Sequence, residues 1–205
     1  MEPGARQDSP AYTAPQRFDE LVQEQREPDR SEWQNPAAVI NLMQPLENKV
    51  VADIGAGTGY FSFLLAAEGA SVISIDIDEA ALDYIREQLQ SMHHEDKGPM
   101  IECRLTAPDD PGLKASEADA VLMVNTYPYL NDRVAYLKSL QAGMKPGAQL
   151  VIVDFKDIDS PVNPSRAYRL PVNRVTADLK KAGFRSINAD IESLEYQYII
   201  TTTKP

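Results

Sequence analysis

The sequence has little cysteine, no long apolar run and few basic side chains. Cys103 is the single cysteine among 205 residues, so an intramolecular disulfide is excluded, and no Cys/His cluster has the spacing of a zinc site. No apolar run approaches the roughly 20 residues that a membrane-spanning helix needs, and residues 1–4 do not resemble the start of a signal peptide. We therefore expect a cytoplasmic protein with no metal centre and no membrane partner.

Basic side chains are outnumbered by acidic ones. The chain has 20 Lys and Arg residues against 31 Asp and Glu residues, which gives a formal net charge of -11. Proteins that bind nucleic acid do so largely by placing Lys and Arg on phosphates. The charge balance therefore argues against a nucleic acid partner and favours a small molecule.

The N-terminal part of the chain differs in composition from the rest. Residues 1–35 contain four prolines, more acidic than basic side chains and few aliphatic residues, which cannot offset the entropy of ordering. We expect a disordered tail over residues 1–16 and a helical lid segment over residues 17–47, with an amphipathic helix from Ala38 to Leu46. One folded domain is expected over residues 48–205.

From residue 48 onward, β-branched runs alternate with helical patterns. This alternation is typical of an α/β fold, in which a mostly parallel, doubly wound sheet carries helices on both faces. Only residues 192–195 separate the last two strands, which is too short for a parallel crossover, so the sheet should end in an antiparallel hairpin. The seven expected strands are Lys49–Ile54, Ser71–Ile77, Met100–Leu105, Ala118–Asn125, Leu150–Phe155, Arg185–Ile191 and Tyr196–Thr203.

The first strand runs into three alternating glycines, Gly55, Gly57 and Gly59. In a doubly wound sheet, ligands bind at the carboxyl ends of strands, and glycine there permits a positive φ and a close approach to the backbone. A dinucleotide site needs its third glycine one residue later, where this chain has Tyr60. No tyrosine is followed by Lys at the fourth position, the dyad of short-chain dehydrogenases. A NAD(P)-dependent oxidoreductase is therefore a remote alternative.

Two carboxylates flank this glycine turn. Asp53 lies two residues before the first glycine, where it would repel a pyrophosphate and attract a cation. Asp76 ends the next strand, where a carboxylate can accept hydrogen bonds from both hydroxyls of a ribose, whereas Asp78 is the expected N-cap of the next helix. S-adenosylmethionine carries a sulfonium, an α-ammonium and no phosphate, so it fits both carboxylates.

With these motifs the chain resembles the class I S-adenosylmethionine-dependent methyltransferases over about residues 30–205. The resemblance rests on Asp53–Gly59, Asp76, Asp119–Asn125, Leu140–Asp154 and the terminal strand pair. More narrowly, Arg30-x-x-Trp33-Gln34-x-Pro36 and Asp154-Phe155-Lys156 are similar to bacterial methyltransferases of small-molecule type. The resemblance implies a seven-stranded Rossmann-like sheet in the order 3-2-1-4-5-7-6, with the last strand antiparallel, over residues 48–205.

The resemblance also implies the residues of the site. Those expected to bind S-adenosyl-L-methionine, and its product S-adenosyl-L-homocysteine, are Asp53, Gly55, Ala56, Gly57, Gly59, Asp76, Ile77, Thr106, Ala107, Asp109 and Asn125. Those expected to form the lid and the acceptor site are Arg30, Trp33, Gln34, Tyr60, Tyr129, Asp154 and Arg166.

Asn125 and Tyr127 are the expected catalytic residues, because they follow the strand that borders the first and should face the sulfonium. Relatives often carry a His in this loop, whereas here Tyr127, Tyr129 and Asp154 are the available candidates for a general base. Methyl transfer from a sulfonium is an in-line displacement with a good leaving group, so alignment and desolvation can supply most of the catalysis.

The leading hypothesis is thus an enzyme that transfers the methyl group of S-adenosylmethionine to a small-molecule acceptor. A regulatory protein that binds S-adenosylmethionine or S-adenosylhomocysteine without turnover is the alternative. We expect a monomer or a homodimer.

Overall fold

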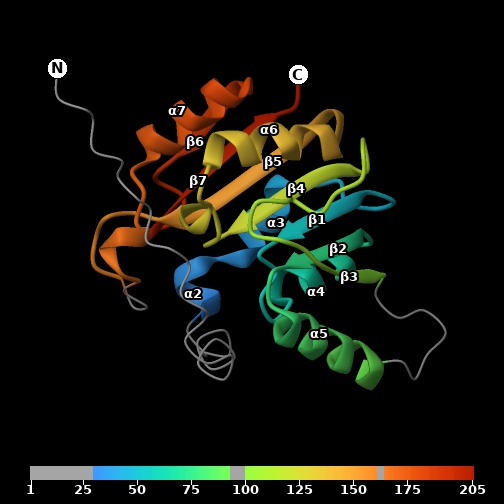
Figure 1. Cartoon of the computed structure of the whole chain (residues 1–205). Coiled ribbons are helices and arrows are strands. Elements are labelled where there is room, and N and C mark those ends of the chain that lie inside the picture. Colours follow the sequence, from blue (N-terminus) through green and yellow to red (C-terminus); the bar gives the residue numbers. More distant parts are fainter. Residues whose placement is uncertain (1–29, 93–99, 161–163) are drawn as a thin grey trace, which may run out of the picture.

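Seven strands form one mixed sheet at the centre of the computed structural model, which describes residues 30–92, 100–160 and 164–205 (Figure 1). Their order is β3-β2-β1-β4-β5-β7-β6. Neighbours from β3 to β5 are parallel, and β7 is antiparallel to both β5 and β6. The expected topology is confirmed. The strands are β1 (Val50–Ile54), β2 (Ser71–Asp76), β3 (Ile101–Leu105), β4 (Ala118–Val124), β5 (Met144–Phe155), β6 (Arg185–Asp190) and β7 (Gln197–Thr203).

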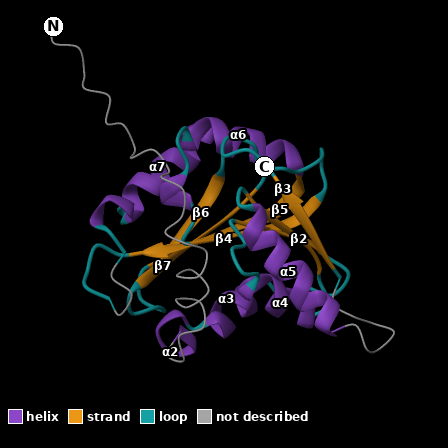
Figure 2. Ribbon diagram, turned by 60° about the horizontal axis from the view of Figure 1, so that its bottom comes forward, coloured by secondary structure: helices purple, strands orange, loops and turns teal. Residues whose placement is uncertain are grey.

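Helices cover both faces of this sheet, with α6 and α7 on one face and α3 and α4 on the other (Figures 1 and 2). The alternation of side chains along a strand explains how β5 serves both layers. Leu150 and Ile152 pack with α6 and α7, while Val151 and Val153 pack with α3 and α4. The helices are α2 (Arg30–Gln34), α3 (Pro36–Leu42), α4 (Tyr60–Ala67), α5 (Glu79–Met92), α6 (Arg133–Gly143) and α7 (Val172–Ala182), with short 3₁₀ turns η1 (Tyr127–Tyr129) and η2 (Arg166–Tyr168).

Two elements differ from their expected ranges by more than one residue. The helix expected over Ala38–Leu46 spans Pro36–Leu42 instead, because proline is favoured in the first turn of a helix and Pro45 cannot continue it. The fifth strand begins at Met144 rather than Leu150. Ala118 lies opposite Met144 but Ala120 lies opposite Gln149, so the start of β5 bulges.

The parallel strands place one set of side chains together. Since β1 to β5 run in the same direction, their carboxyl ends meet at one edge of the sheet. Asp53, Asp76, Thr106, Asn125 and Asp154 all lie at or directly after these ends. This edge is where we look for the site.

The expected tail over residues 1–16 and residues 17–29 of the expected lid segment lie outside the described residues. Within the ranges described, no helix is long and apolar enough to cross a membrane. Within the same ranges, no group of three or more His, Cys, Asp or Glu side chains is placed to hold a metal ion.

Candidate cofactor and acceptor site

The glycine turn after β1 has a backbone that only glycine adopts readily. The φ angles of Gly55, Gly57 and Gly59 are 72°, 55° and 81°, all in the left-handed region. A Cβ on Gly55 would collide with the side chain of Thr126, and a Cβ on Gly59 would lie 2.8 Å from Ile85. The turn therefore presents bare backbone between the end of β1 and the start of α4.

Asp76 ties this turn to the end of β2. One carboxylate oxygen accepts a 2.8 Å hydrogen bond from the Gly57 amide. The other accepts from the amides of Ile77 and Asp78 at 2.7 and 3.0 Å. Asp78 in turn accepts from the Ala80 amide at the start of α5, as the sequence predicted for an N-cap. Burial raises the pKa of Asp76, so its ionised form depends on these donors.

Asp53 lies beneath the turn and is only 3% exposed. The Ser62 hydroxyl donates to its carboxylate at 2.7 Å, and the Ser74 hydroxyl donates to Ser62 at 2.7 Å. Burial raises the pKa of Asp53 to about 6, although the Ser62 hydrogen bond and the charge of Arg30 act in the opposite direction. No sequence motif predicted this pair of serine hydrogen bonds, because Ser62 lies in α4 and Ser74 lies in β2.

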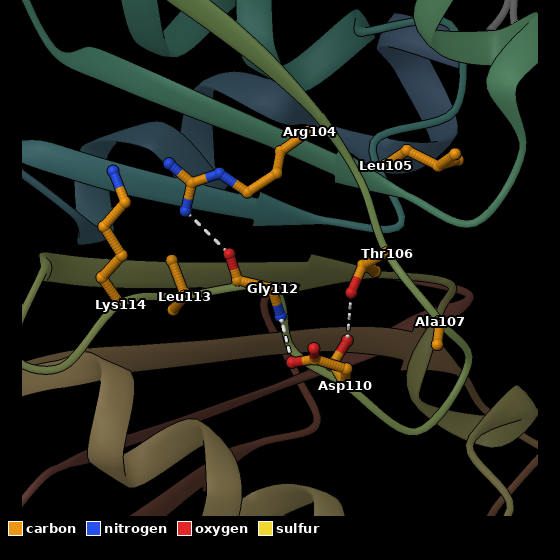
Figure 3. Close-up of a pocket in the computed structure, with 8 residues that line it drawn as sticks. All are labelled: Arg104, Leu105, Thr106, Ala107, Asp110, Gly112, Leu113 and Lys114. Atoms are coloured by element: carbon orange, nitrogen blue, oxygen red, sulfur yellow. Dashed lines mark hydrogen bonds between the residues drawn. The ribbon is translucent and has the colours of Figure 1, made fainter.

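The loop after β3 forms an open pocket of about 660 Å³ (Figure 3). Its backbone is joined to the end of β2, since the Thr106 amide donates to the Asp76 carbonyl at 3.0 Å. Asp110 closes the loop by accepting from the Gly112 amide at 2.8 Å. The pocket is lined by Arg104, Leu105, Thr106, Ala107, Asp110, Gly112, Leu113 and Lys114.

One sequence expectation is not met in this loop. Asp109 is exposed and does not line the pocket, whereas Asp110 does. The signal for Asp110 was the Asp-Pro-Gly sequence, because an Asp side chain often accepts from the amide two residues later in a turn.

The fold and the turn agree with what comparison with known proteins finds. The sequence profile of the methyltransferase domain matches residues 52–152. The structure of a SAM-dependent methyltransferase from Aquifex aeolicus superposes with a TM-score of 0.81 at 22% identity, over 92% of this chain and 99% of that one. Residues 52–152 of the chain thus belong to the methyltransferase domain family, and the chain has the fold of a SAM-dependent methyltransferase.

Two curated methyltransferases show how varied the relatives are. A demethylmenaquinone methyltransferase from Tropheryma whipplei is 32% identical over 159 residues, which is 78% of this chain and 61% of that protein. A tRNA U34 carboxymethyltransferase from Sulfurovum sp. is 29% identical over 128 residues, 61% of this chain and 41% of that protein. The chain thus spans less than two thirds of the length of these relatives.

The residues of the turn fit S-adenosylmethionine, the cofactor that the methyltransferase domain implies. Positive-φ glycines leave bare backbone at the turn. Asp53 is a buried carboxyl whose pKa is held up by burial, so a bound cation would favour its ionised form. Asp76 ends β2 with both carboxylate oxygens oriented by backbone donors.

The lid residues lie over the start of α4. The Arg30 guanidinium lies 4.1 Å from the centroid of the Tyr60 ring, and its Nε donates to Gln34 Oε1 at 2.6 Å. The Trp33 ring stacks on Phe155 at the end of β5, with centroids 5.6 Å apart. Arg30, Trp33 and Gln34 are all buried, so α2 is packed onto the carboxyl edge of the sheet.

Asn125 stands between the turn and β5 in the left-handed region, with a φ of 56°. Its backbone N–H donates to the Val153 carbonyl at 2.9 Å. Its side-chain oxygen accepts from Gln197 Nε2 at 2.6 Å. Sequence reasoning missed Gln197, which begins β7 and is 72 residues away in the chain.

Tyr127 does not face the site, so its expected placement was wrong. The residue is completely buried, and its hydroxyl donates to Asp178 of α7 at 3.4 Å. Burial and the charge of Asp178 raise the pKa of Tyr127, which removes it as a general base near neutral pH. The reason is the 3₁₀ turn η1, which directs this side chain into the core under α6 and α7.

The remaining acceptor-side candidates differ in exposure. Tyr129 is 39% exposed and stacks on Tyr168 with centroids 4.3 Å apart. The Arg166 side chain is 78% exposed and its Nε lies 3.8 Å from Asp157, so it stands at the surface. Asp154 is 1% exposed, and burial raises its pKa well above the usual range.

Proposed function

We propose that this chain transfers the methyl group of S-adenosylmethionine to a small-molecule acceptor. The observation that carries the proposal is the glycine turn closed by the Gly57–Asp76 hydrogen bond, with the buried Asp53 beneath it. Two carboxylates at a turn of bare backbone favour a cationic cofactor over one that carries a pyrophosphate.

Each residue of the turn would then have one task. Asp76 would accept hydrogen bonds from the ribose hydroxyls, which are charge-assisted and therefore strong. Asp53 would attract the α-ammonium. The pocket after β3, with Thr106 and Ala107 at its wall, would take the adenine. When bound, the cofactor supplies a methyl group on a sulfonium, which is a good leaving group.

The acceptor would enter beside Asn125, between the lid helix α2 and the turn η1. The Tyr129 ring is 39% exposed and stacks on Tyr168, and the buried rings of Trp33 and Phe155 stack at the end of β5. Such surfaces suit an apolar or planar acceptor, and a quinone-modifying relative is consistent with that choice.

A dedicated base is not part of the proposal. Burial raises the pKa of Asp154 well above its usual range, and Tyr127 faces the core, so neither is assigned the role of a base. Asn125, held by Gln197, would position the acceptor, and the lid would exclude water.

Labelled methyl transfer from S-adenosylmethionine into separate metabolite, quinol and tRNA pools tests the proposal. We expect the label in a small molecule. Label in tRNA alone would overturn the small-molecule acceptor, which the net charge of -11 disfavours but a tRNA-modifying relative makes worth testing. Binding of the cofactor without label in any pool would favour the regulatory alternative. The cytoplasmic location and the monomeric or homodimeric state stay predictions.

A further inference from the structure

A buried cation stands beside the glycine turn. Arg30 is 7% exposed, and its guanidinium lies over the ring of Tyr60, the first residue of α4. Gly59 caps this helix without a side-chain hydrogen bond. The positive end of the α4 dipole and the Arg30 charge therefore act on the same region next to the turn.

Two further buried donors accompany Arg30. Among the residues that the structure describes, Trp33 Nε1 and Gln34 Nε2 are buried without a hydrogen-bond partner. The Gln34 amide is held in one orientation because its oxygen accepts from Arg30 Nε, so its NH₂ group is the end left to bind something else. Buried donors without partners cost free energy, and an acceptor brought by a ligand would recover it.

Asp53 is a buried carboxyl that lies close enough to Arg30 to respond to its charge. Asp53 feels the charge of Arg30, which lowers its pKa against the effect of burial. The two charges thus face one region of the site, with donors on the lid side and a carboxylate on the sheet side. A ligand that carries an anion and a cation on one carbon would match both.

We propose that Arg30, with Gln34 and Trp33, binds the α-carboxylate of the cofactor's methionine moiety while Asp53 binds its α-ammonium. This inference rests on the proposed cofactor. It assigns Arg30, Trp33 and Gln34 to cofactor binding, whereas the sequence predicted that they form the lid and the acceptor site. The planar guanidinium of arginine can donate two parallel hydrogen bonds to a carboxylate. Packing on the Tyr60 ring would require only its positive charge.

Calorimetry with a pair of cofactors tests the clamp. S-adenosylmethionine has both groups, and its decarboxylated form keeps the sulfonium and the ammonium but lacks the carboxylate. Wild-type protein should bind S-adenosylmethionine about tenfold to a hundredfold more tightly than the decarboxylated form. Arg30→Gln should reduce this ratio to near one, and Arg30→Lys should give an intermediate ratio.

Two other variants keep the test interpretable. Asp53→Asn should weaken both compounds by a similar factor and leave their ratio unchanged, because both carry the ammonium. Arg86→Gln removes an exposed arginine of α5 and should leave both affinities unchanged. Thermal unfolding of each ligand-free variant shows that it is folded before its ratio is compared.

The outcomes separate the two proposals. Binding of S-adenosylmethionine with the same ratio in wild type and folded Arg30→Gln would overturn the clamp and leave the cofactor assignment intact. Failure of folded wild-type protein to bind either compound would overturn both.

Discussion

The Gly57 amide and the Asp76 carboxylate are joined by a 2.8 Å hydrogen bond that links the turn after β1 to the end of β2. The same carboxylate that we expect to bind the ribose therefore also holds the turn in place. Structure and binding are coupled at this residue, which makes its substitution informative.

Asp76→Ala should weaken S-adenosylmethionine and S-adenosylhomocysteine together, by tenfold or more, because both share the ribose. It should also lower the free energy of unfolding by about 1–3 kcal/mol, since three backbone donors lose their acceptor. Calorimetry and denaturant unfolding measure the two effects. Asp83→Ala, on the exposed side of α5, is the control; unchanged affinity in Asp76→Ala would remove it as the ribose ligand.

Gly55→Ala and Gly147→Ala form a matched pair. Their φ angles are 72° and 74°, so alanine is strained equally at both positions. Only at Gly55 would the new Cβ meet Thr126, while at Gly147 nothing lies within 4 Å. We expect about 1–2 kcal/mol of destabilisation for Gly147→Ala and clearly more for Gly55→Ala, with loss of cofactor binding. Equal unfolding midpoints for the two variants would contradict the close packing of Thr126 on the turn.

Asp53 predicts a pH dependence of stability with a defined sign. Its pKa rises from 3.8 to about 6 on folding, so the folded state favours the protonated form. Stability should therefore fall as pH rises from about 4 to about 6 and stay level above that. Asp53→Asn removes this effect and should gain at most about 3 kcal/mol at pH 7.5, measured by denaturant unfolding. The raised pKa would be contradicted if the free energy of unfolding of the wild type increased over this pH interval and the increase were absent in Asp53→Asn.

The ionisation of Asp53 should also change the affinity for S-adenosylmethionine, in the opposite direction with pH to its effect on stability. The ionised Asp53 attracts the ammonium, so affinity for S-adenosylmethionine should increase as pH rises through about 6. Titrations at pH 5 and pH 7.5 measure it, and a flat profile in wild type would show that Asp53 does not sense the ligand.

Asn125→Ala should affect catalysis, whereas Tyr127→Phe should affect stability. Asn125 lies at the turn, so its loss should reduce kcat by tenfold or more once an acceptor is known. The Tyr127 hydroxyl contacts Asp178 in the core, so Tyr127→Phe should cost about 1 kcal/mol of unfolding free energy instead. A large fall in kcat for a fully folded Tyr127→Phe would return this hydroxyl to the reaction.

The sequence predicted what local patterns control. The strand order followed from alternating elements, the short link before β7 and a family resemblance, and the turn followed from three glycines after a buried strand. The sequence also predicted correctly that Asp78 is the N-cap of α5.

Residues whose role depends on distant partners could not be predicted in this way. Gln197 reaches Asn125 from another strand, and Ser62 reaches Asp53 from the helix after the turn. Tyr127 was misplaced because one turn of 3₁₀ helix decides whether its ring faces the site or the core. Periodicity carries no information about such a rotation.

Calorimetric titration of the folded wild-type chain with S-adenosylmethionine tests the central claim most directly. We predict saturable, one-to-one binding that is weakened tenfold or more by Asp76→Ala and left unchanged by Asp83→Ala. The absence of binding to either S-adenosylmethionine or S-adenosylhomocysteine, with protein shown to be folded, would contradict it.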